Sequence, residues 1–342
     1  YELTASHNAP QTPKIETLVF NFYQNEEELL EALAEGKIAS SPSLSPESFA
    51  ALDVDTYTII EKPLPRTFSI SFNQNRSTAL RDLAVRQALN VAIDRTALID
   101  EVLQGHGIPI TNPVPPGFIA IESADASPTL STDNDTRIEQ AKTILQKGGW
   151  EQNEEGAWEK EIDEEEVTLA ITIATENSDL FDRTATAIAS RWSELGVQVS
   201  VDQFERADLV QAIIRPRSFQ ALLFGNDVGR AVDLYPFWHS SQKDDPGLNI
   251  AQYTNIDTDA LLEKARIDTD ENTRAQTLAE FTAVIEEELP ALFLFTPTFS
   301  YVLDKNVSAS SMVRISKPSE RFANITQWHI TANKLWPVFN NK

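Results

Sequence analysis

The chain contains no cysteine among its 342 residues. This absence excludes a thiol nucleophile, disulfide bonds and thiolate metal sites, and it leaves the redox compartment open. A leading methionine and a signal peptide are absent too, since the chain starts at Tyr1. We therefore expect a processed or trimmed product whose targeting segment has been removed.

Positive charge and long apolar runs are scarce. There are 28 basic residues against 52 acidic ones, a net charge of −24 at pH 7. Such a surface repels phosphate backbones and anionic lipid, so nucleic acid and membrane surfaces are poor partners. No stretch reaches the roughly 18 consecutive apolar residues of a membrane helix.

Several catalytic and metal-binding patterns are missing. The four histidines, His7, His106, His239 and His329, stand alone, and no two have the i, i+4 spacing of metal ligands. There is no Gly-x-Ser-x-Gly elbow and no phosphate-cradling glycine loop. Paired carboxylates serve glycosidases, but among 52 acidic residues some pair is always available. We expect no metal, no cofactor and no enzymatic activity.

The residues that are present favour a packed protein with two lobes. The hydrophobic content is 41%, and 342 residues exceed a comfortable single core. Alternating strand and helix patterns from 158 to 224 predict an α/β lobe, and 121–132 reads as a polar surface loop. The expected helices are Glu26–Leu33, Thr136–Gln146, Phe181–Leu195, Ala207–Ile214, Thr258–Arg266 and Thr273–Glu288. The expected strands are Lys14–Tyr23, Thr56–Ile60, Thr67–Phe72, Val167–Ala174, Val197–Phe204, Phe219–Phe224, Ala291–Phe295 and Tyr301–Leu303.

The most regular stretch runs from Arg81 to Gly117. Apolar residues recur at helical spacing after Asp82, whose carboxylate can cap the first turn. A second helix starts at Asp94, and Gly105 is a candidate left-handed C-cap. The prolines that follow forbid further helix and predict an extended connection.

This stretch carries a resemblance. It contains Val85-Arg86-Gln87-Ala88-Leu89-Asn90, then Ala92-Ile93-Asp94-Arg95, Gly105-x-Gly107 and Pro115-Pro116-Gly117. The order resembles the signature of the extracellular solute-binding proteins of ABC importers, family 5, which includes oligopeptide- and dipeptide-binding proteins. Within that signature, Arg86 and Arg95 are predicted to serve the fold through salt bridges.

The resemblance implies an α/β, periplasmic-binding-protein-like fold of type II. One complete ligand-binding lobe would span 79–311, and remnants of the second lobe would be 1–78 and the C-terminal return 312–342. The implied function is that of a non-enzymatic receptor, which captures peptides or a related small solute in an interlobe cleft by hinge closure. Its other partner would be a membrane permease, and its location extracytoplasmic, periplasmic or as a cell-surface lipoprotein.

Aromatic rings and polar groups alternate after the strand that ends near residue 224. Rings supply apolar area and the polar groups fix orientation, as a cleft for an extended polar ligand requires. The resemblance implies that Asp227 is the acid that meets a ligand's α-amino group, and that Phe224 stands where the family usually has tryptophan. Core packing remains the alternative for Trp238, and a turn for Asp233. The full set of candidates is Phe224, Asp227, Asp233, Trp238, His239, Ser241, Asn249 and Tyr253.

Two other functions stay open. Similar lobes can be the ligand-sensing domains of transcriptional regulators, and a hydrolase remains the less favoured alternative. Because the N-terminal part of the second lobe is not in this chain, we expect an incomplete cleft wall, an open sheet edge and weak ligand binding.

Overall fold

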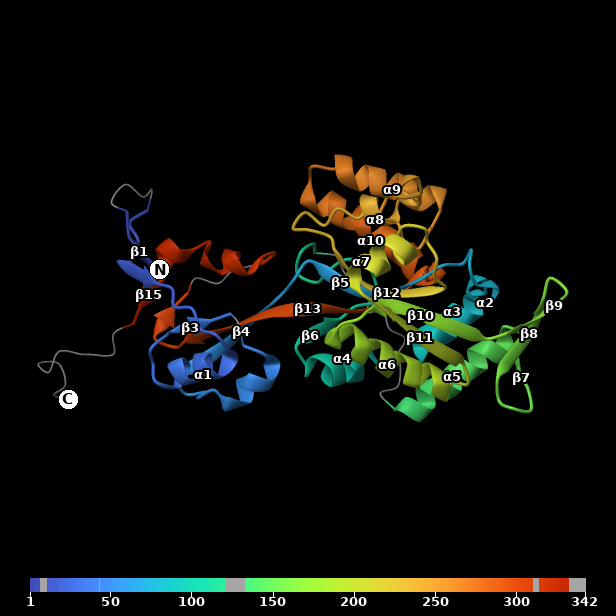
Figure 1. Ribbon diagram of the computed structural model, residues 1–342. Helices are drawn as coiled ribbons and strands as arrows, with labels where there is room; N and C mark the ends of the chain where they lie inside the picture. Colours follow the sequence, from blue (N-terminus) through green and yellow to red (C-terminus); the bar gives the residue numbers. More distant parts are fainter. Residues whose placement is uncertain (7–10, 43, 121–132, 310–313, 332–342) are drawn as a thin grey trace, which may run out of the picture. The chain divides into compact units, whose positions relative to one another are not determined.

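The protein divides into two compact units, seen here in a computed structural model that describes residues 1–6, 11–42, 44–120, 133–309 and 314–331 (Figure 1). Unit 1 consists of Tyr1–Leu64 with Thr298–Lys342, and unit 2 is Pro65–Pro297. The loop predicted at 121–132 lies outside the described residues. The lobe boundaries expected at 78/79 and 311/312 stay a prediction.

Unit 2 is built on a mixed sheet. Its strands lie in the order β11 (Gln198–Phe204), β10 (Ala170–Glu176), β12 (Ala221–Asp227), β5 (Arg66–Phe72) and the first part of β13 (Ala291–Asp304). The pairs β11/β10 and β10/β12 are parallel, whereas β12/β5 and β5/β13 are antiparallel. Strand β6 (Gly107–Pro109) also pairs with β13. The predicted α/β fold class is confirmed.

Helices cover both faces of this sheet (Figure 1). One apolar core unites the sheet with α2 (Thr78–Arg81), α3 (Leu83–Val91), α4 (Arg95–Leu103), α5 (Asn134–Lys147) and α6 (Asp179–Glu194). A second core gathers α8 (Tyr235–Trp238), α9 (Ile256–Ile267) and α10 (Glu271–Glu288). Along β13, Leu292 packs into the first core and Phe293 into the second. A strand covered on both faces reads as a continuous apolar run, which explains Ala291–Phe295.

The two helices of the central stretch begin where predicted, and Asp82 is the predicted N-cap of the first. Asp82 accepts a hydrogen bond from the backbone N of Ala84 at 2.9 Å, and Asp94 accepts from Thr96 at 2.9 Å. The C-cap prediction is wrong by one residue, because Gln104 (φ 51°) is the left-handed cap and Gly105 (φ 84°) follows it. Two successive residues of positive φ end this helix.

The two signature arginines are buried, and their hydrogen bonds go mainly to backbone carbonyls rather than to the carboxylates that salt bridges require. Arg86 Nη2 donates to the carbonyl of Glu288 at 2.9 Å. Arg95 Nε donates to the carbonyls of Phe293 at 2.7 Å and Ile110 at 2.9 Å. Burial, with a smaller effect of the nearby Arg137, lowers the pKa of Arg95 to about 10. Both side chains tie helices to the chain around β13.

Two other expectations need correction. The helix expected at Ala207–Ile214 is a short α7 (Arg206–Asp208) followed by a wider π-helical turn, Leu209–Ile214. The two strands expected at Ala291–Phe295 and Tyr301–Leu303 are one 14-residue strand, β13. It stays continuous because its partner changes from β5 and β6 to β4 along its length. A three-stranded sheet, β7 (Glu151–Gln152), β8 (Trp158–Ile162) and β9 (Glu165–Thr168), completes unit 2.

Unit 1 is smaller and its elements are shorter. The second part of β13 pairs with β4 (Tyr57–Pro63) on one side and β3 (Ser40–Ser41) on the other. Two hairpin-like pairs are separate from this sheet, β1 (Glu2–Thr4) with β2 (Thr17–Val19) and β14 (Val307–Ser308) with β15 (His329–Ile330). Helix α1 (Glu26–Ala34) is confirmed, whereas the strand expected at Lys14–Tyr23 is limited to β2. Two small apolar clusters hold the unit, one under α1 and one around Trp328.

Across the described ranges, no helix has both the length and the apolar character that crossing a membrane requires.

Candidate functional site

The eight predicted site residues all lie in unit 2, and they fall into separate groups of contacts. Phe224 and Asp227 belong to β12, where the Phe224 ring stacks on Phe181 with centroids 6.5 Å apart. Asp227 ends the strand with its side chain 51% exposed. Its carboxylate lies 3.3 Å from Nε of Arg66 and accepts a hydrogen bond from the backbone N of Gly229 at 3.0 Å. This acid is open to solvent and loosely paired.

The second group is organised by Asn249, which is fully buried. Its Nδ2 donates to the carbonyls of Trp238 at 3.3 Å, His239 at 3.2 Å and Tyr253 at 2.8 Å. Trp238 and Tyr253 are buried against each other, with ring centroids 6.3 Å apart and the planes at 73°. A polar side chain that satisfies three carbonyls inside a loop stabilises the loop's shape. In this structure Trp238, Asn249 and Tyr253 therefore stabilise the packing of this loop.

Tyr253 also binds the end of α10. Its hydroxyl donates to Oε2 of Glu288 at 2.6 Å, and burial followed by this hydrogen bond raises the pKa of Tyr253. The neighbouring Asn255 donates to Oε1 of the same carboxylate at 2.9 Å. Glu288 therefore holds the 249–255 loop to α10 and is not an open acid.

His239 and Ser241 are in contact, with 2.9 Å between Nδ1 and Oγ. The backbone N of Ser241 donates to the same Nδ1 at 3.1 Å, so the imidazole caps a short turn at Ser240–Gln242. Nε2 of His239 lies 3.5 Å from Glu263 and 3.9 Å from Asp259, both outside hydrogen-bond distance. A serine nucleophile needs a histidine that a third group orients, and these distances do not provide it.

Asp233 belongs to a stack of side chains at the surface. Its carboxylate pairs with the guanidinium of Arg266 at 2.5 and 3.0 Å, which raises the pKa of Arg266. The guanidinium lies 3.9 Å from the centroid of Tyr235, and that ring stacks on His239 at 4.1 Å. Both acids are paired with an arginine, but Arg266 binds Asp233 through two nitrogens, whereas Arg66 meets Asp227 through one nitrogen at 3.3 Å.

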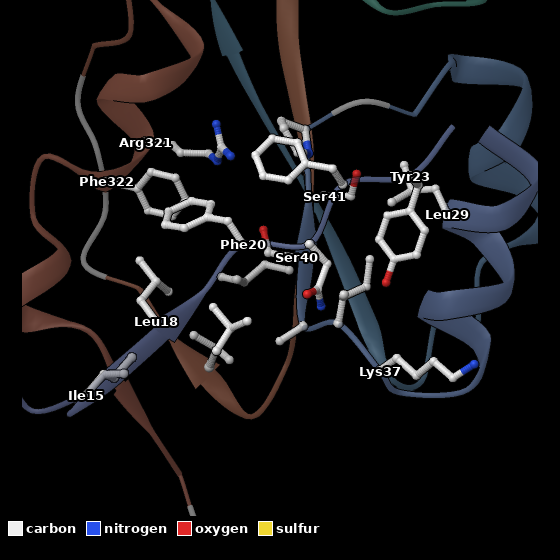
Figure 2. A pocket seen from close by; sticks show the side chains of 18 of the residues that line it. Ile15, Leu18, Phe20, Tyr23, Leu29, Lys37, Ser40, Ser41, Arg321 and Phe322 are labelled. Carbon is white, nitrogen blue, oxygen red and sulfur yellow. The ribbon is translucent and has the colours of Figure 1, made fainter. Parts of the chain in front are cut away.

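The structure contains a cavity of about 650 Å³, and it lies in unit 1 (Figure 2). Its wall mixes apolar and polar side chains, and every residue of Thr17–Glu26 and Lys37–Pro42 lines it. None of the eight predicted site residues lines it. The sequence predicted a strand at Lys14–Tyr23 and gave no signal for this cavity.

A smaller cavity of about 290 Å³ lies in unit 2 beside β10, β11 and β12. Its polar lining includes Arg76, Asp202 and Gln220. None of the eight candidates lines this cavity either. In the parts of the chain that the structure describes, no group of three or more histidine, aspartate or glutamate side chains could hold a metal ion.

Solved structures of solute-binding proteins share this fold. The oligopeptide-binding protein AppA from Bacillus subtilis, solved with a nonapeptide, superposes with a TM-score of 0.66 at 23% identity, covering 93% of this chain and 61% of that one. HbpA2 from Haemophilus parasuis gives 0.73 at 23% identity, covering 87% of this chain and 56% of that one. The predicted type II, periplasmic-binding-protein-like fold is confirmed.

The sequence profile of the bacterial extracellular solute-binding proteins, family 5, matches residues 2–246. The chain therefore belongs to this family, as its signature stretch predicted. Among curated relatives, AppA of Bacillus subtilis is 24% identical over 262 residues, 76% of this chain and 46% of the relative. The dipeptide-binding protein of Escherichia coli is 24% identical over 298 residues, 86% of this chain and 52% of the relative. The chain spans about half the length of these relatives.

Proposed function

We propose that this chain supplies the ligand-binding part of a peptide-binding component of an ABC importer. Its membership of the solute-binding family carries the proposal. Relatives named as oligopeptide- and dipeptide-binding proteins support peptides as the ligand class. In this proposal the protein works outside the cytoplasm, as the family description states, and a lipid anchor is one way of retaining it there.

Asp227 is the residue that we assign to the ligand's α-amino group. It ends β12 beside Phe224, its carboxylate is half-exposed, and one nitrogen of Arg66 is its cationic partner. A ligand ammonium can displace a weak, solvent-exposed pair at little cost, because such pairs contribute about 0–1 kcal/mol. Asp233, by contrast, would have to break a bidentate pair with Arg266. Trp238, Asn249 and Tyr253 then support the site by fixing the loop beyond Asp233.

The proposal includes capture by hinge closure and delivery to a membrane permease. A ligand shifts an open–closed equilibrium only by as much as it binds one state better than the other. Contacts made only in the closed state would therefore supply the difference. The permease would then receive the closed, loaded form. Small-angle scattering with and without peptide tests closure, and an unchanged radius of gyration at saturation contradicts it.

The experiment that tests the function is calorimetry with a mixed library of tripeptides, on the protein as its gene encodes it. Asp227→Asn removes the charge at constant volume, and we expect a loss of about 2–5 kcal/mol of binding free energy. Its unfolding free energy should change by less than about 1 kcal/mol. The matched control is Asp179→Asn, because Asp179 is also an exposed acid paired with an arginine, Arg183 at 2.7 Å. Equal affinity in both variants removes Asp227 from the site, and no heat with any peptide contradicts the ligand class.

No contact or cluster in the described residues favours a regulator or a hydrolase over this function. The Ser241–His239 contact is the nearest approach to a catalytic pair, and its geometry is that of a cap.

A further inference from the structure

The cavity of about 290 Å³ in unit 2 is separate from the site proposed for peptides. It reaches β12 at Gln220, the residue before the strand begins, whereas Asp227 ends the strand. Strand β12 pairs with β5 so that Ala221 lies opposite Phe72 and Asp227 lies opposite Arg66. The distance along the strand from Ala221 to Asp227 is about 20 Å, because a strand rises ~3.3 Å per residue.

The side chain of Gln220 is oriented by the backbone of β10. Its Oε1 accepts a hydrogen bond from the backbone N of Thr172 at 2.8 Å, and Thr172 lines the cavity too. Strand β10 is in register with β12 at Ile173 and Ala174, so this bond extends the contact between the two strands. An N–H group bonds to the amide oxygen and not to the NH₂ group, which fixes the orientation of the amide. Within the described residues Nε2 makes no hydrogen bond, so it is available to a ligand as a donor.

Two charged side chains of opposite sign line the cavity. Arg76 and Asp202 are exposed, and within the described ranges neither side chain forms a hydrogen bond or an ion pair. The backbone N of Arg76 donates to Asn73, whose own N donates to the carbonyl of Gln220 at 2.8 Å, so the cation belongs to the β12 side. Asp202 lies on the edge strand β11, opposite Ala174 of β10. Two strand spacings of ~4.8 Å separate β11 from β12, so the charges come from opposite sides of the cavity.

The wall between these charges is largely apolar. Phe219 is buried, and Phe204 and Ile213 are half-buried. Ile213 belongs to the π-helical turn Leu209–Ile214. Such turns are rare and are frequent at functional sites. An occupant therefore meets aromatic and aliphatic carbon between a cation and a carboxylate.

We propose that this cavity binds a free α-amino acid with an apolar side chain. A guanidinium binds a carboxylate through two parallel N–H groups, so Arg76 takes the carboxylate and Nε2 of Gln220 adds a donor. Asp202 takes the ammonium group, and the apolar wall receives the side chain. Pockets for small molecules range from about 300 to 1,000 Å³, so a volume of about 290 Å³ favours a ligand of one residue. The proposal concerns a second site and does not rest on the proposed function.

The test is an NMR titration of the ¹⁵N-labelled protein, as its gene encodes it, with L-leucine. The amide signals of Thr172, Asp202 and Gln220 should shift and saturate together, because all three residues line the cavity. Two analogues isolate the charges, since leucinamide lacks the carboxylate and N-acetyl-leucine lacks the ammonium group. Each should bind about tenfold more weakly than leucine, because a charge-assisted hydrogen bond is lost.

Matched variants assign each charge to a side chain. Arg76→Gln should weaken leucine binding about tenfold and leave leucinamide binding unchanged, because leucinamide has no carboxylate for Arg76 to bind. Asp202→Asn should weaken leucine binding to a similar extent and leave N-acetyl-leucine binding unchanged. The control is Arg183→Gln, because Arg183 is an exposed arginine outside the cavity, and it should change none of these affinities.

Unshifted amide signals in the cavity at saturating leucine overturn the proposal. Shifts confined to Asp227 and Gly229 overturn it as well, because leucine would then occupy the site proposed for peptides. Equal weakening by Arg76→Gln and Arg183→Gln would indicate an effect of net charge and remove Arg76 from the site. Tighter binding of leucyl-leucine than of leucine at the cavity overturns the assignment of a single amino acid. Since the two sites report through different amides, failure here leaves the proposed function standing.

Discussion

The two parts of β13 lie in different environments. In unit 2, Leu292 and Phe293 point to opposite sides and both sides are packed with helices. In unit 1, Val302 and Tyr301 also point to opposite sides, but each meets only a small cluster. The same strand is therefore the centre of a complete core in one unit and of a thin one in the other.

Surface exposure follows the same division. Six of the ten large apolar side chains that are exposed among the described residues belong to unit 1, the smaller unit: Tyr1, Leu3, Val19, Phe22, Val54 and Ile330. Apolar side chains left in water cost free energy in proportion to their area. The comparison teaches that unit 2 buries most of its large apolar side chains, whereas the smaller unit 1 leaves more of them exposed among the described residues.

The largest difference between the units should be in the unfolding free energy lost when a buried leucine is replaced by alanine in each core. Leu89 in α3 and Leu33 in α1 are both fully buried. We expect Leu89→Ala to lower the unfolding free energy by about 3–5 kcal/mol, because the tightly packed core of unit 2 cannot collapse around the cavity. Leu33→Ala should cost about 2 kcal/mol, since a small cluster relaxes more easily.

Hydrogen exchange measures both losses separately, through the amides of β10 for unit 2 and those of β4 for unit 1. Leu89→Val is the conservative control. Equal losses at Leu89 and Leu33 would show that the two cores are packed equally well, and the comparison would fail.

An intermediate loss of unfolding free energy is expected at Asp82. Its counterpart in unit 1 is Glu26, a second carboxylate whose pKa is lowered by hydrogen bonds. Asp82 accepts hydrogen bonds from Ala84 N, Trp150 Nε1 at 3.0 Å and Lys160 Nζ at 2.7 Å. Burial alone would raise the pKa of Asp82, but these donors outweigh it and lower it. Asp82→Asn should cost about 2 kcal/mol at pH 7, since it weakens a helix cap and a partly buried pair.

The pH dependence checks the cause. A carboxyl whose pKa is lowered by folding stabilises the protein above its unfolded pKa, about 3.9, and this contribution is lost as pH falls through the folded pKa. The difference between Asp82→Asn and the parent should therefore be constant near neutral pH and shrink below about pH 4. In Glu26 the hydrogen bonds from Ser48 and Ser45 lower the pKa without a cationic partner. Glu26→Gln should cost less, and a larger loss there would reverse the comparison.

The helices of unit 2 were predictable because their signals are local. Asp82 caps its helix as expected, and the second helix starts at Asp94 as expected. The continuity of β13 was not predictable in this way. It depends on partners distant in sequence, such as Ile59 opposite Val302 and Ile70 opposite Leu292.

The candidate site was predicted only from residue types that follow a strand end. Such a pattern does not tell which side chains are buried and which are open to a ligand. The sequence could place Trp238 and Asn249 in one segment, but it could not tell that Asn249 is buried with three carbonyls. Burial depends on tertiary contacts of the loop, such as the hydrogen bond from Tyr253 to Glu288 of α10. The cavity in unit 1 could not be predicted from the sequence, because its wall comes from 15–42 and 303–330, which meet only in the folded protein. Whether the eight residues bind ligand stays a prediction.

The smallest effect should come from the exposed apolar side chains of unit 1. Phe22 is 79% exposed, and its ring meets that of Tyr1 edge to face at 5.9 Å. Phe22→Ser should change the unfolding free energy by less than about 0.5 kcal/mol, because surface substitutions outside packed features rarely do more. Ile256→Ser in unit 2, where Ile256 is 83% exposed, is the matched control. Chemical denaturation of both variants measures this. If Phe22→Ser costs more than about 1 kcal/mol while Ile256→Ser costs nothing, then Phe22 is covered in solution. The exposed apolar side chains of unit 1 would then be covered by a contact of its own.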